Sequence, residues 1–116
     1  MRPIAYDEVC KASEEQIVEL INRRQRQILI HSYLYEDRNY PLISDSTWDL
    51  WAKQLAELMK RPEAKKSAYA KYFEDWTGDT AADLQEAFRL PEIMDKASML
   101  IETMSNMYSD LSKIYG

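Results

Sequence analysis

Two aspartates and two aromatic residues lie within one short stretch of the chain, as Tyr35, Asp45, Trp48 and Asp49. Asp45 precedes Trp48 by three residues and Asp49 by four, so on a helix all three share one face. Aromatic rings beside carboxylates can stack on a flat cationic ring and compensate its charge. The pattern indicates a small-ligand site. Two alternatives stay open, with Tyr35 and Trp48 as core aromatics and Asp45 as an ordinary helix N-terminal acid.

A long helix should place Tyr35 at its end. Ser13 and Gln16 have capping-box spacing, which predicts a helix from Ser13 to about Tyr35 or Glu36. The apolar residues with helical spacing in this stretch are Ile17, Leu20, Ile21, Ile28 and Tyr35, with Val18, Leu29 and Leu34 beside them. His31 falls on the same face, where we expect a partly buried, hydrogen-bonded side chain.

A second helix should carry the aspartates. Pro41 keeps Tyr40 out of helical geometry, and Ser44 can cap a helix that has Asp45 in its first turn and ends before Pro62. Its apolar residues are Trp48, Trp51, Leu55, Leu58 and Met59. Two helices joined by a short loop should lie antiparallel or crossed and bury these stripes together.

The rest of the chain also indicates helices. We expect one over 63–72, a loop with a turn at Gly78, a short helix over 80–88, and a long helix from Pro91 to the C-terminus. Only two glycines and no strand-like alternation occur. The predicted fold is all-α, a single domain over residues 1–116 with four to five helices. It is built on an antiparallel helical hairpin over about 13–62, followed by a helical part over 63–116.

Composition excludes several classes of protein. The chain has one cysteine, Cys10, and one histidine, His31, which excludes an internal disulfide and zinc-finger spacing. The same shortage makes most catalytic triads of a nucleophile and a histidine nearly impossible. We therefore expect no enzyme, no catalytic residues and no metal site. No apolar run is long enough to span a membrane, and the first residues lack a secretory signal, so we expect a cytoplasmic protein without a membrane partner.

Two surfaces could bind macromolecules. Arg23, Arg24 and Arg26 form a basic turn that could contact nucleic acid phosphates, although the net charge of −5 favours a solvated charged face. The methionines of the last predicted helix are Met94, Met99, Met104 and Met107. We expect them to fill the core, and the alternative is an adaptable face for a homodimer or another protein partner.

The segment around the aspartates resembles the N-terminal helical domain, domain Ia, of bacterial NAD-dependent DNA ligases. The matching stretches, without a gap, are Tyr33-Leu34-Tyr35-Glu36, then Asn39-Tyr40-Pro41-Leu42-Ile43-Ser44-Asp45, then Ser46-Thr47-Trp48-Asp49-Leu50, and Leu55-Ala56-Glu57-Leu58. The resemblance covers about residues 15–62. The second half, around residues 72–80, is similar to small phage or prophage proteins that join such a hairpin to a separate tail.

The resemblance implies binding of nicotinamide mononucleotide or NAD. Tyr35, Asp45 and Asp49 match nucleotide-contact positions of that family, while Trp48 replaces a tyrosine and Glu36 replaces a tyrosine or histidine. The chain has no Lys-x-Asp-Gly adenylation motif. The resemblance thus implies a non-catalytic accessory of DNA metabolism that binds a nicotinamide nucleotide or a host protein. The alternative is a helical structural or interaction protein, a dimer that keeps the hairpin only as a scaffold.

Overall fold

The computed structural model describes the backbone of residues 1–115 and the side chains of residues 1–107. In this part of the chain every regular element is helical, which confirms the all-α prediction. The α-helices are α1 (Glu14–Glu36), α2 (Asp45–Leu58), α3 (Gln85–Phe88) and α4 (Pro91–Tyr115). Short 3-10 helices are η1 (Tyr6–Lys11), η2 (Pro62–Lys66), η3 (Ala70–Tyr72) and η4 (Ala82–Leu84).

Helix α1 begins where the capping box predicts. The Ser13 hydroxyl accepts a hydrogen bond from the Gln16 amide at 3.2 Å, and the Gln16 side chain accepts one from the Ser13 amide at 3.0 Å. These two bonds satisfy backbone donors that the first helical turn leaves free. Helix α2 begins in the same manner, because the Ser44 hydroxyl accepts from the Thr47 amide at 3.1 Å.

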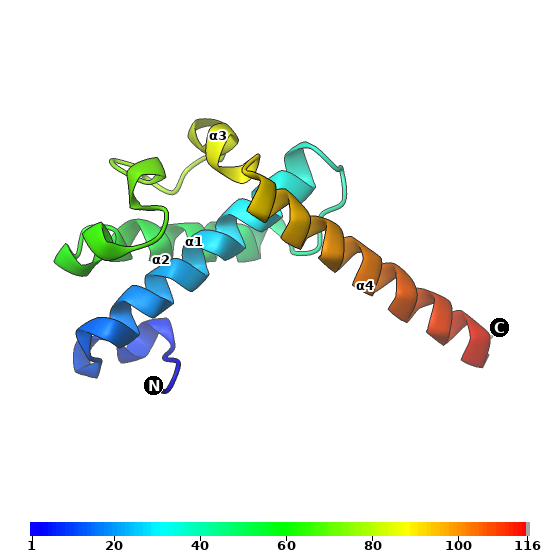
Figure 1. The fold of residues 1–116 in the computed structure, drawn as a ribbon, viewed down its shortest axis with the longest axis horizontal. Helices are drawn as coiled ribbons and strands as arrows, with labels where there is room; N and C mark the ends of the chain where they lie inside the picture. Colours follow the sequence, from blue (N-terminus) through cyan, green and yellow to red (C-terminus); the bar gives the residue numbers. More distant parts are fainter. Residues whose placement is uncertain (116) are drawn as a thin grey trace.

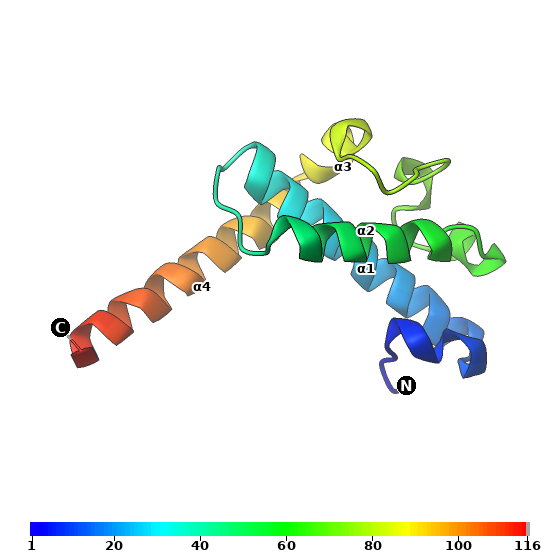
Figure 2. The same cartoon turned by 180° about the vertical axis from the view of Figure 1, so that it is seen from behind.

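The first two helices form the predicted hairpin. They run in opposite directions and cross at an angle, with α4 on the other side of α1 (Figures 1 and 2). The fully buried residues of α1 and α2 include Leu20, Ile21, Ile28, Leu29, Leu34 and Leu55. Phe73, Leu84 and Phe88 from the later segments close this core. Removing so much apolar surface from water, at about 25 cal/mol per Å², is what holds the helices together.

The prediction of a helix over residues 63–72 is wrong, since the chain there makes only η2 and η3. Side-chain amides of α1 accept the backbone N–H groups that a continuous helix would use internally. The Asn22 side chain accepts from the Ala68 amide at 2.7 Å, and that of Gln25 accepts from the Tyr69 amide at 3.2 Å. These long-range bonds hold Ser67 and Ala68 outside helical geometry.

The turn at Gly78 is confirmed. Its φ of +82° is a conformation that disfavours other residues, and a Cβ there would lie 2.8 Å from the Ala52 carbonyl oxygen of α2. The chain can pass this close to α2 only without a side chain. The short helix predicted to end near Phe88 is present as η4 followed by α3.

Helix α4 leaves the body of the molecule halfway along its length (Figures 1 and 2). Ile93 and Ala97 in its first turns are buried, and Met94 is partly buried against the core. Met99, Met104 and Met107 are 56%, 42% and 54% exposed, so the prediction that they fill the core is wrong. The reason is geometric, because no other described segment extends far enough to cover them.

The molecule is elongated as a result. Its extents are 52 × 31 × 25 Å and its radius of gyration is 15.7 Å, above the roughly 13 Å of a compact domain of this length. Within residues 1–115, no helix combines the length and apolarity needed to cross a lipid bilayer.

Candidate functional site

The four residues of the predicted site line one pocket. It has a volume of about 320 Å³ and lies where the end of α1, the connecting loop and the start of α2 meet. Its lining residues are His31, Ser32, Tyr35, Glu36, Pro41, Leu42, Ile43, Ser44, Asp45, Trp48, Asp49, Thr80 and Ala81. Tyr35, Asp45, Trp48 and Asp49, chosen from spacing, are thus brought to one place.

The loop between the helices is shaped by backbone geometry. Asn39 adopts a φ of +49°, a conformation that asparagine tolerates better than most residues. The Tyr40 amide then donates to the Leu34 carbonyl at 2.9 Å and closes the end of α1. Pro41 follows, so the chain turns away and returns to Ser44 along the pocket wall.

Trp48 is fixed in the wall of the pocket. Its indole N–H donates to the Ser32 hydroxyl at 3.1 Å, and its ring meets Trp76 edge-on at 6.2 Å between ring centroids. Trp76 in turn donates to the Thr80 carbonyl at 2.8 Å, which holds Thr80 and Ala81 at the pocket. The Trp48 ring is therefore a half-buried, oriented surface that a ligand can contact.

Tyr35 is 55% exposed, so the alternative that it is a core aromatic is wrong. Helix α1 ends one residue later, at Glu36, and Tyr35 thus lies beyond the core that the rest of the stripe fills. Trp48 divides its surface between the core and the pocket. Tyr35 and Trp48 together give the pocket two aromatic groups, each with surface open to a ligand.

The electrostatic character of the pocket is negative. Glu36, Asp45 and Asp49 line it, all three are exposed, and no lysine or arginine is among the lining residues. Possible counter-charges nearby are engaged elsewhere. Lys53 pairs with Asp79, and Arg38 donates to the Ser98 hydroxyl at 3.2 Å. Among the described side chains, neither Lys53 nor Arg38 therefore pairs with Asp49.

His31 lies at the inner side of the pocket, half-buried against the Trp51 ring at 5.7 Å between centroids. The prediction of a hydrogen-bonded histidine is wrong for Nδ1, which is buried without a partner in the described part of the chain. Burial holds the pKa of His31 below its usual value, because the charged imidazolium would lose its hydration. Burial therefore disfavours a positive charge on His31 at the pocket.

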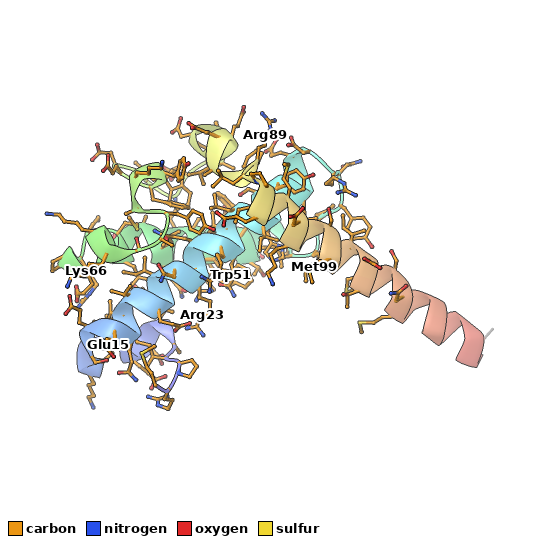
Figure 3. The ribbon with its side chains drawn as sticks, viewed as in Figure 1. Glu15, Arg23, Trp51, Lys66, Arg89 and Met99 are labelled. Carbon is orange, nitrogen blue, oxygen red and sulfur yellow. The ribbon has the colours of Figure 1, made fainter. Side chains whose placement is uncertain are left out.

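The basic turn of α1 is used within the chain. Arg23 donates to the Ile4 carbonyl, while Arg24 bonds Gln27 at 2.8 Å and lies 5.3 Å from the centroid of the Trp51 ring (Figure 3 labels Arg23 and Trp51). Only Arg26 of the three is exposed. Arg23 and Arg24 are therefore less available to contact nucleic acid phosphates than the sequence suggests.

Sequence reasoning missed Ser32, Thr80 and Ala81. A buried indole N–H requires an acceptor, and a serine one helical turn from Tyr35 was the available signal for Ser32. Thr80 and Ala81 reach the pocket through the Gly78 turn, and no local pattern marks them. Among the described side chains, no group of three or more histidine, cysteine, aspartate or glutamate residues is placed to hold a metal ion.

Comparison with known proteins adds no relative to this picture. No protein-family model, curated protein or solved structure matches the chain.

Proposed function

We propose that the chain is a non-catalytic binding module whose pocket between α1 and α2 holds a flat organic cation. One observation carries the proposal: Tyr35, Trp48 and two exposed aspartates line the same pocket of about 320 Å³. Aromatic faces attract cations and stack on flat rings, and each carboxylate adds about 1 kcal/mol of attraction at 4 Å in water. The volume lies at the small end of the range for ligand pockets.

The nicotinamide ring is the cation that the resemblance to ligase domain Ia suggests. A nicotinamide riboside unit carries its positive charge on a flat ring, so it suits the aromatic and acidic lining. The same resemblance, which covers only residues 15–62, supports a role for the protein as a non-catalytic accessory of DNA metabolism, and we include that role in the proposal.

The lining favours a ligand without a phosphate. Glu36, Asp45 and Asp49 line the pocket and no cationic side chain does, so a phosphate inside it would meet only like charges. In the proposed complex the ring of a nicotinamide nucleotide lies in the pocket and its phosphate projects into solvent. We therefore expect 1-methylnicotinamide, which carries its methyl group and positive charge on the ring nitrogen, and nicotinamide riboside to bind at least as tightly as nicotinamide mononucleotide.

Isothermal titration calorimetry tests the proposal directly. Asp49→Asn should weaken 1-methylnicotinamide binding about five-fold, since about 1 kcal/mol of attraction is lost. Asp7→Asn is the matched control, because Asp7 is an exposed aspartate in η1, at the other end of α1. We expect it to leave the affinity unchanged.

Two results would count against this function, and a third would count against the exclusion of phosphate. Absence of binding at millimolar concentrations of all three ligands would end it. Equal losses in Asp49→Asn and Asp7→Asn would show that net charge, and not the pocket, attracts the ligand. Tighter binding of the mononucleotide than of the riboside would keep the site but overturn the exclusion of phosphate.

A further inference from the structure

The apolar stripe of α4 has coiled-coil spacing. Ile93, Ala97, Leu100, Met104 and Met107 follow one another at steps of four, three, four and three residues. This is the a/d pattern of a heptad repeat, which pairs one helix with another along a continuous seam. The sequence continues the same spacing at Leu111 and Ile114.

The body of the protein covers only the beginning of this stripe. Ile93 and Ala97 are 1% and 0% exposed, whereas Leu100, Met104 and Met107 are 37%, 42% and 54% exposed. Figure 3 labels Met99 near the point where α4 leaves the body, and this side chain is already 56% exposed. The helix thus continues a core-type pattern beyond the core, and that pattern lacks a partner within the described part of the chain.

Charge favours a second copy as that partner. Between residues 97 and 107 the only charged residue is Glu102, which falls at the position opposite the seam. Binding of a different, oppositely charged partner would require charged residues at the positions that flank the seam. This stretch has no charged residue at those positions. Two identical seams can therefore meet without like charges facing each other.

We propose that the chain forms a homodimer in which the free halves of two α4 helices pair in antiparallel orientation. An antiparallel pair places the two bodies, each in a chain of net charge −5, at opposite ends of the contact. A parallel pair would bring them side by side, where like charges repel. In this arrangement Met104 of one copy lies beside Met107 of the other, and the methionines fit the irregular seam.

Sedimentation equilibrium of the full chain, with paired variants, tests this proposal. The unmodified chain should sediment as a dimer at micromolar concentration, and Met104→Glu should raise the dissociation constant at least ten-fold by placing a charge in the seam. Ser105→Glu adds the same charge at the next residue, which faces away from the seam, and should leave the dimer intact. Circular dichroism of both variants serves as the control that they remain folded.

Cross-linking tests the orientation, in a Cys10→Ser background that removes the one native thiol. The antiparallel pair predicts a disulfide when Met104→Cys and Met107→Cys chains are mixed. It predicts none between two Leu100→Cys chains, which lie about 16 Å apart along the axis at 1.5 Å per residue. A monomer at 100 μM, a dimer that survives Met104→Glu, or efficient cross-linking of Leu100→Cys would each overturn the proposal.

Discussion

Gln25 offers a demanding test of how the chain frames its pocket. This side chain is fully buried, donates to the Ser67 hydroxyl at 2.9 Å and accepts from the Tyr69 amide at 3.2 Å. It thereby ties α1 to the segment that continues to Trp76 and the pocket wall. Its amide nitrogen also donates to the Met59 sulfur at 3.4 Å. Leucine has nearly the same volume but neither polar group, so Gln25→Leu removes all three bonds with little change in packing.

The expected cost follows from the two groups left behind. The Tyr69 N–H would lose the acceptor it has in the fold, which costs about 1–3 kcal/mol for a buried donor. The Ser67 hydroxyl keeps its bond to the Ala64 carbonyl and contributes less. We therefore expect a loss of about 2 kcal/mol, or roughly 8 °C in Tm for a domain of this length.

Thermal and urea unfolding followed by circular dichroism measure this loss. Gln27→Leu is the matched control, because Gln27 lies on the same helix and only accepts a bond from Arg24 on a partly exposed surface. Its effect should stay within about 0.5 kcal/mol. A Gln25→Leu protein as stable as the unmodified chain would refute the reasoning, since the amide would then not hold residues 67–69 in place.

Three further predictions concern other parts of the fold. Gly78→Ala should destabilise the protein by more than about 1 kcal/mol in urea unfolding, because it combines an unfavourable φ with contact against Ala52. Arg89 lowers the pKa of Asp37, so the stability from this pair is present above about pH 4 and is lost as pH falls through the folded-state pKa; Asp37→Asn should flatten that acid limb of the stability profile by under about 1 kcal/mol. Burial lowers the pKa of His31, so stability should decline as pH falls below about 6.5, and His31→Gln should remove that part of the decline.

The hairpin was predictable because its signals are local. The Ser13 and Ser44 caps, the break at Pro41 and the helical spacing of apolar residues each act within a few residues, and the structure follows them. Spacing also grouped Asp45, Trp48 and Asp49, since residues three and four apart on α2 necessarily share a face. Tyr35 joins them at the pocket because the short loop places the end of α1 beside the start of α2.

The segment after Pro62 was not predictable for the opposite reason. Its composition favours a helix, but Asn22 and Gln25, more than 40 residues away, bind its backbone and prevent one. Likewise, the exposure of Met104 and Met107 depends on how far the other helices reach, and an amphipathic pattern alone does not reveal whether its apolar face is covered.

One NMR titration tests the central claim most directly. The chain has three tryptophans, and only the indole N–H of Trp48 bonds Ser32 at the pocket. With Trp48→Phe used for assignment, 1-methylnicotinamide should shift the Trp48 indole signal in a saturable manner and leave that of Trp51 nearly unchanged. Unchanged spectra at millimolar ligand, or a saturable shift at Trp51 without one at Trp48, would contradict the account.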